Sequence, residues 1–209
     1  MADKKILVAP LNWGLGHATR CIPIINALLE EGFEPVIASD GSALNLLKNE
    51  YPGTAFHELP GYNIKYSSSG LFFRSKLFSQ TPHILKTIIA EKKLTAQIIK
   101  DEKINGIISD SRWGVRNEEI PSVFITHQVN VLSGFTTKLS SMIHKKYIRK
   151  FDECWVPDVE GDPNLSGRMS HGLKEGLNLK YIGILSRFQK LDLTVIYDLA
   201  VVLSGPEPQ

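Results

Sequence analysis

The stretch that decides the fold is "ILVAPLNWGLGHATRCIPIINALLEEGFEPVIASD", residues 6–40. It begins with a short apolar run that Pro10 ends, and this run predicts a buried strand over 6–9. Apolar residues at helical spacing then predict a helix over 18–31. A second apolar run predicts the next strand over 33–39. Alternation of continuously apolar strands with a helix is typical of a parallel sheet that helices cover on both faces.

The same alternation continues along the chain. Strands are expected over 54–60, 104–110, 121–128 and 153–158, and a strand with its exit loop over 179–188. Helices are expected over 41–51 (with Ser42 as N-cap), 82–101 and 134–150. Residues 61–82 form a long irregular stretch of the kind that is usually functional or mobile. The predicted fold class is therefore α/β, a Rossmann-like parallel sheet with helices on both faces.

Composition narrows the possible functions. The chain has 209 residues with a net charge of +2, which is too small to indicate a nucleic-acid partner. Cys21 and Cys154 have the spacing of neither a disulfide framework nor a metal site, and they favour a reducing compartment. The first apolar run is too short for a signal peptide, and no segment has the length of a membrane span. We expect a cytoplasmic protein, with contact to a membrane surface left open.

The loop over 10–17 should lie beyond the carboxyl end of the first strand, where open parallel sheets bind ligands. Gly14 and Gly16 allow close backbone approach, and the helix that follows them suits an anion. A dinucleotide-binding loop is one interpretation, with Asp40 at the end of the second strand as ribose ligand. Against it, Thr19 occupies the third glycine position and the loop carries bulky side chains.

His17 is the candidate catalytic residue, because it starts the helix at the mouth of this crevice. A neutral imidazole there can take a proton from a hydroxyl when an acid fixes its tautomer. Asp110 ends the predicted strand over 104–110 and should open into the same crevice, so it is the natural partner. The alternative is that both side chains only cap their local turns.

Further polar residues border the crevice. Arg20, one turn into the helix, is placed either to reach a phosphate or to pair with an acid on a neighbouring helix. His127 and Gln128 lie at the carboxyl end of the predicted strand over 121–128. They suit sugar hydroxyls or an acceptor, although a buried histidine satisfied by backbone is as good an interpretation. Weaker candidates are Ser109, Ser111 and Arg112.

Two basic amphipathic segments bear on the acceptor: "GLFFRSKLF" over 70–78 and "KLSSMIHKKYIRK" over 138–150. Segments of this kind can lie on an anionic membrane surface. We prefer the interpretation that the apolar stripe of each segment packs on the core while its basic face stays in water.

The first loop, with Pro10, Gly16, His17 and then Pro23, resembles that of nucleotide-sugar-dependent glycosyltransferases of the GT-B fold. That family includes the plant-type UDP-glycosyltransferases and the lipid-intermediate N-acetylglucosaminyltransferase of peptidoglycan synthesis. The fuller string "GLGHATR", with "ISD", "THQ", "LSG", "IGILSRF" and "LSGPEPQ", is similar to a bacterial group of predicted glycosyltransferases. The resemblance covers essentially the whole chain, as the acceptor-side half of the family.

The resemblance implies roles for individual residues. In plant-type relatives the histidine of this loop is the general base for the acceptor hydroxyl and a later aspartate orients it, so these roles fall on His17 and Asp110. Gly14 and Gly16 become substrate contacts, beside the candidates already named. The implied donor is a nucleotide sugar that supplies a hexosyl or N-acetylhexosaminyl group, without a cofactor or metal. The implied acceptor is a sugar or a lipid-linked molecule, which would place the protein at the inner face of the membrane.

The resemblance also implies a division of the chain. Residues 1–190 would form the acceptor-side domain, and 191–209 a linker and the first strand of a truncated donor-binding domain. The apolar end of "YDLAVVLSGPEPQ", over 197–209, predicts that buried strand, and the chain alone is expected to be inactive. The alternatives are a nucleotide-sugar epimerase of the same fold, a non-catalytic sugar-binding module and a dinucleotide-dependent oxidoreductase.

Overall fold

A computed structural model of the chain describes residues 4–63, 73–171, 176–188, 192, 194, 196–199 and 201. Strands within these ranges are β1 Lys5–Pro10, β2 Glu34–Ser39, β3 Ala55–Glu58, β4 Ile104–Asp110, β5 Ser122–Ile125, β6 Glu153–Val156 and β7 Leu179–Tyr181. Helices are α1 Gly16–Glu30, α2 Gly41–Glu50, α3 Phe73–Glu102 and α4 Thr137–Ile148, with single 3-10 turns at Gly134–Thr136 and Gly167–Met169.

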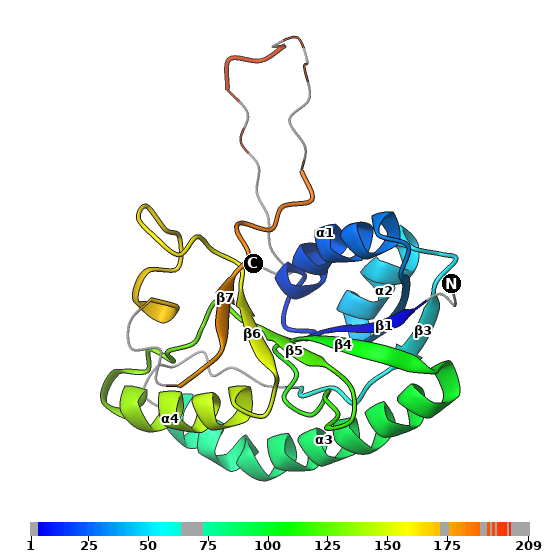
Figure 1. Cartoon of the computed structure of the whole chain (residues 1–209). Coiled ribbons are helices and arrows are strands. Elements are labelled where there is room, and N and C mark those ends of the chain that lie inside the picture. Colours follow the sequence, from blue (N-terminus) through cyan, green and yellow to red (C-terminus); the bar gives the residue numbers. More distant parts are fainter. Residues whose placement is uncertain are drawn as a thin grey trace.

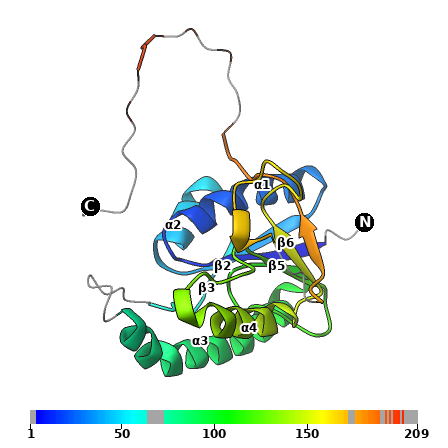
Figure 2. The ribbon, with the colours of Figure 1, turned by 90° about the vertical axis from the view of Figure 1, so that its left-hand side faces the viewer.

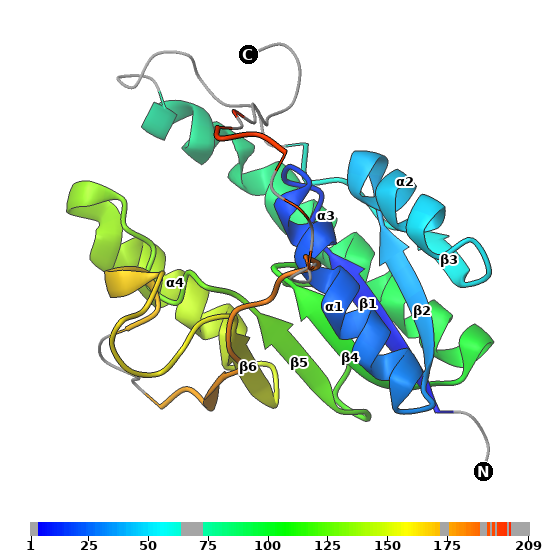
Figure 3. The same ribbon diagram turned by 90° about the horizontal axis from the view of Figure 1, so that it is seen from above.

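The strands form one parallel sheet in the order β3-β2-β1-β4-β5-β6-β7. Figure 1 shows α1 and α2 on one face and α3 and α4 on the other, and the two turned views agree (Figures 2 and 3). The predicted fold class is confirmed. Because the strand order reverses between β1 and β4, a ligand crevice is expected where the carboxyl ends of these two strands diverge.

Burial on both faces explains why the central strands are apolar throughout. Neighbours Leu7 and Val8 in β1 point to opposite faces, and each is completely buried. Val8 packs with Ile25 of α1 on one face of the sheet, whereas Leu7 packs with Ile98 of α3 on the other face. Each residue pair of this kind anchors a helix, so the sheet is a rigid base for the loops at its carboxyl edge.

Several element boundaries differ from the sequence expectations. Helix α3 begins at Phe73 rather than 82, so the second half of the expected loop is helical. Pro82, the first residue of the expected helix, lies inside α3. The strand predicted over 121–128 ends at Ile125, and those over 54–60, 153–158 and 179–188 are also shorter. No helix of the described ranges is both long and apolar enough to span a bilayer.

Helix α2 is capped by another residue than expected. Its N-cap position is Asp40, without a side-chain capping bond, and Ser42 lies inside the first turn. Asn12 from the β1–α1 loop acts instead: its Oδ1 accepts bonds from Ala43 N at 3.2 Å and Ser42 Oγ at 2.9 Å. Gly41 leaves the room for this contact, since a Cβ there would lie 2.3 Å from Asn12 Nδ2. The capping bond thus ties the loop to α2.

The buried strand expected within 197–209 is not seen where this segment is described. Residues 196–199 and 201 are in no strand, and Tyr197, Leu199 and Val201 are exposed. A strand requires a hydrogen-bonded neighbour, and β7 is paired only with β6 within the described sheet. The strand was expected as part of a donor-binding domain, so its assignment stays a prediction, and the remainder of the segment lies outside the described residues.

Candidate active site

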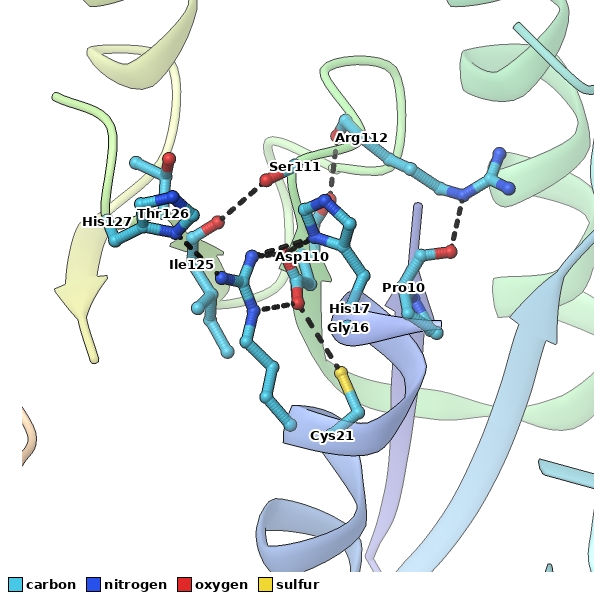
Figure 4. Close-up of polar contacts among 12 residues, drawn as sticks. Pro10, Gly16, His17, Cys21, Asp110, Ser111, Arg112, Ile125, Thr126 and His127 are labelled. Carbon is cyan, nitrogen blue, oxygen red and sulfur yellow. Dashed lines mark hydrogen bonds and ion pairs between the residues drawn. The ribbon is translucent and has the colours of Figure 1, made fainter. Parts of the chain in front are cut away.

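The carboxyl ends of β1 and β4 bring His17 and Asp110 into contact. Asp110 is the last residue of β4, lies in register with Pro10 and is completely buried. His17 is in the first turn of α1, and its Nδ1 lies 2.9 Å from Asp110 Oδ1 (Figure 4). Two residues 93 positions apart in sequence therefore meet at the point where the strand order reverses.

Arg20 is the third member of this cluster. Its Nε and Nη2 donate to the two carboxylate oxygens of Asp110 as a bidentate fork. Nη2 also lies 2.8 Å from His17 Nδ1, and Nη1 lies 3.0 Å from His127 Nδ1. Of the two interpretations of Arg20, pairing with an acid is the one observed. The acid is Asp110 on the sheet rather than a residue of a neighbouring helix.

The cluster carries a buried negative charge that Arg20 balances. Burial alone would raise the pKa of Asp110, but the Arg20 charge and the hydrogen bonds from Arg20 and His17 lower it to about 2. Cys21, with its Sγ 3.8 Å from Asp110 Oδ2, has its thiol pKa raised by burial and by that carboxylate. Asp110 is thus ionised and Cys21 neutral at physiological pH.

His127 and Gln128 lie just beyond β5, in the loop rather than in the strand. His127 is half-buried, and burial together with the charges of Arg20 and His17 lowers its pKa, so the ring is neutral near pH 7. It lines a cavity of about 210 Å³ with Arg20, Asp158 and Met169. Gln128 is held through its backbone N, which donates to Thr126 Oγ1 at 3.0 Å, and does not line this cavity.

Gly14 and Gly16 in the first loop have no neighbouring atoms where a side chain would lie. Gly14 has a φ of +72°, which favours glycine, and a Cβ at Gly14 or Gly16 would have no atom within 4 Å. The first turn of α1 has neither a side-chain cap nor an acidic residue. Its backbone N–H groups therefore suit an anion.

The far wall of the cavity depends on Asp158, which the sequence interpretation missed. This buried carboxylate follows β6 and accepts bonds from the backbone N of Val159, Leu165 and Ser166 at 2.8–3.1 Å and from the Ser166 hydroxyl. Burial raises its pKa, yet these hydrogen bonds bring the pKa well below the usual range. The available signal was an aspartate at the end of a predicted strand, followed by turn residues.

Arg112 holds the same edge of the sheet together through buried hydrogen bonds. Its completely buried guanidinium donates to Glu91 Oε1 at 2.8 Å, to Asp40 Oδ1, and to the carbonyls of Pro10 and Pro60 at 2.9 and 3.2 Å. It thereby joins the ends of β1, β2 and β3 to α3. Its partners are 21 to 102 residues away, so no local pattern points to them.

This network also bears on the dinucleotide interpretation. Both carboxylate oxygens of Asp40 are engaged, Oδ1 by Arg112 and Oδ2 by Asn12 Nδ2 at 3.1 Å. A ribose ligand needs a carboxylate that is open to the crevice. The Asp40 carboxylate thus ties the β1–α1 loop to Arg112, which makes a structural role its observed one, while the dinucleotide interpretation stays an untested alternative.

The expected orientation of the second amphipathic segment is wrong. Leu139, Met142 and Ile143 on α4 are 46–59% exposed, whereas His144 and Ile148 face the core. His144 points into the core, because Trp113 and Phe124 pack against its ring. Of the other amphipathic segment, 70–72 and the side chains of 73–79 lie outside the described part.

His144 gives a pH prediction for stability. Burial lowers its pKa to about 4, against about 6.5 in an unfolded chain. The folded state therefore binds fewer protons than the unfolded state between these values, and the free energy of unfolding should fall by about 3 kcal/mol as pH drops from 6.5 to 4. Trp113 Nε1 donates to His144 Nδ1 at 3.2 Å. His144→Gln keeps an acceptor for this bond and should flatten the slope in urea unfolding measured across that range. An unchanged slope would refute the assignment.

Comparison with known proteins agrees with the fold. No protein-family model matches the chain. An uncharacterised glycosyltransferase of Methanosarcina mazei is 26% identical over 167 residues, which cover 74% of this chain and 43% of that protein. A UDP-glucosyltransferase of Polygonum tinctorium superposes with a TM-score of 0.55 at 12% identity, covering 88% of this chain and 53% of that structure.

A second similar structure carries the name of another activity. A protein described as a UDP-N-acetylglucosamine 2-epimerase of Listeria monocytogenes has a TM-score of 0.51 at 10% identity, covering 75% of this chain and 39% of that structure. The chain has the Rossmann-like fold of the GT-B class and is similar in sequence to a glycosyltransferase, as its first loop suggested. It spans less than half the length of the curated relative that it matches.

Proposed function

We propose that this chain is the acceptor-binding half of a glycosyltransferase of the GT-B fold. The enzyme would transfer a hexosyl or N-acetylhexosaminyl group from a nucleotide sugar to an acceptor hydroxyl. The observation that carries the proposal is the contact of His17 Nδ1 with Asp110 Oδ1 at 2.9 Å, at the ligand crevice of the sheet.

The chemistry follows from this contact. With its proton on Nδ1 donated to Asp110, His17 leaves Nε2 bare, and Nε2 takes the proton of the acceptor hydroxyl. The oxygen attacks the anomeric carbon while the bond from that carbon to the diphosphate breaks. Asp110 stays ionised and stabilises the imidazolium that forms. The N-terminus of α1, beside Gly14 and Gly16, would balance the charge that develops on the diphosphate.

The donor half is proposed to be a second α/β domain. We propose residues 1–190 as the acceptor-side domain and 191–209 as the linker and first strand of the donor domain. The matched share of the curated relative, 43% of its length, supports a missing half. The 209-residue chain alone should then show no turnover, and activity has to be measured on the polypeptide that holds both halves.

The outer face of α4 is proposed to contact the cytoplasmic face of a membrane that presents a lipid-linked acceptor. Exposed Leu139, Met142 and Ile143 lie between exposed Lys138 and Lys146, a combination that suits anionic lipid. Met142→Asp should reduce sedimentation of the chain with phosphatidylglycerol vesicles by about tenfold or more, whereas Ile89→Asp, at an exposed position of α3, serves as the matched control. Equal sedimentation of wild type and Met142→Asp would contradict the contact.

A nucleotide-sugar epimerase is the second candidate, because one similar structure has that activity in its name. Both enzymes would bind a nucleotide sugar, but only transfer needs an acceptor. The two-domain protein would be incubated with radiolabelled nucleotide sugars, with and without a pool of sugar and lipid-linked acceptors. Label should move to product only when acceptor is present. A changed sugar without acceptor would favour epimerisation, and binding without any reaction would favour a sugar-binding module.

A further inference from the structure

The guanidinium of Arg20 lies within hydrogen-bond distance of both His17 and His127. Arg20 binds Asp110 through Nε and Nη2, and its remaining nitrogen, Nη1, lies 3.0 Å from His127 Nδ1. A guanidinium has five N–H donors and no acceptor, and it stays charged at any ordinary pH. A hydrogen bond between Arg20 and His127 therefore requires Nδ1 of His127 to be the acceptor.

We propose that Arg20 is a positioning residue that fixes the proton of neutral His127 on Nε2. His127 then offers an N–H donor to the neighbouring cavity rather than a base. The ligand group that fits it is an oxygen with a free lone pair, on a phosphate or a sugar of the substrate. The identity of that oxygen rests on the proposed function, whereas the proton position rests on geometry alone.

The surroundings of His127 support a neutral ring. Burial, the Arg20 guanidinium and His17 all disfavour a second proton, against the opposing charges of Asp110 and Asp158. The ring is half-buried on the cavity wall, and β5 ends two residues before it. Because Arg20 is itself held by both oxygens of Asp110, Nη1 has little freedom to turn away from His127.

The arrangement separates the roles of the two histidines. His127 can donate from Nε2 but cannot accept a proton there, because Nδ1 is the only bare nitrogen and Arg20 occupies it. His17 Nδ1 lies against the Asp110 carboxylate as well as against Arg20, so its proton position is not dictated in the same way. Of the pair, only His17 is left to act as base.

The test is ¹⁵N NMR of the 209-residue chain with labelled histidine, about two pH units above the ordinary histidine pKa of 6.5. His127 should show the downfield shift of a bare nitrogen at Nδ1 and a directly bonded proton at Nε2. Arg20→Lys keeps a cation beside Asp110, but a single ammonium cannot also reach His127. The Nδ1 signal of His127 should then move to the average of exchanging tautomers, while Arg149→Lys, at the exposed position that follows α4, leaves it unchanged.

A proton on Nδ1 of His127 in the wild type would overturn the proposal, as would a His127 signal that Arg20→Lys leaves in place. The wild-type spectrum decides the question even where Arg20→Lys does not fold. Turnover plays no part in the measurement. Absence of transfer activity would therefore overturn the proposed function and leave the proton position of His127 standing.

Discussion

Replacing His17 with alanine is expected to lower kcat for sugar transfer by about 10²–10⁴-fold, the usual contribution of a general base. Without the imidazole, the acceptor hydroxyl must lose its proton to water during attack. The fold should survive, because Arg20 still balances the buried Asp110 carboxylate through two hydrogen bonds. The measurement is kcat and KM of the two-domain protein with its nucleotide sugar and acceptor.

The matched control for this experiment is His83→Ala. His83 lies exposed on α3, on the opposite face of the sheet from α1 (Figure 1), and its loss should leave kcat unchanged. A base that acts only in the chemical step predicts a fall in kcat with little change in KM. If His17→Ala retains the wild-type kcat, the assignment of His17 as general base is wrong.

Replacing Arg112 with leucine is expected to lower the free energy of unfolding by about 3–5 kcal/mol, because it leaves buried charge without a partner. Glu91 is completely buried and would lose the guanidinium 2.8 Å from its Oε1. Tyr62 and Gly114 N, which donate to the other oxygen at 2.7 and 3.0 Å, cannot balance a full charge. Asp40 and two carbonyls would lose a donor as well.

Denaturant unfolding of the 209-residue chain measures this effect. Lys92→Leu is the control, since exposed Lys92 pairs with exposed Glu118 at 3.7 Å and its loss should cost about 0–1 kcal/mol. The double variant Arg112→Leu/Glu91→Gln should recover part of the loss, because it removes one of the stranded charges. A loss for Arg112→Leu no greater than that for Lys92→Leu would show that the network does not hold this edge together.

The fold and the contact of His17 with Asp110 were accessible from sequence for one reason. Continuously apolar strands imply a parallel sheet, and a parallel sheet places the residues after its strands at one edge. His17 follows β1 and Asp110 ends β4, so the strand assignments alone brought them together. The predicted end of β4 is the observed one, and that of β1 differs by one residue, so both side chains were assigned to the correct edge.

Other features depended on information that local patterns do not carry. Arg20 was expected at a phosphate or a helix acid, but its partners Asp110 and His127 are 90 and 107 residues away. Helix α3 passes through Pro82, which by itself favours a helix start. The apolar stripe of α4 faces outward because the pocket for its inner face is shaped by Trp113, a residue from another element.

The central claim is that Nε2 of His17 is free to take a proton. His17 Nδ1 lies 2.9 Å from Asp110 Oδ1 and 2.8 Å from Arg20 Nη2. With a proton on Nδ1, His17 donates to Asp110. With a bare Nδ1, His17 accepts from Arg20. The ¹⁵N spectrum of labelled histidine, recorded about two pH units above the ordinary histidine pKa of 6.5, distinguishes these two proton positions. The account predicts a proton on Nδ1 and a bare Nε2 at His17. A proton on Nε2, with Nδ1 accepting from Arg20, would contradict it.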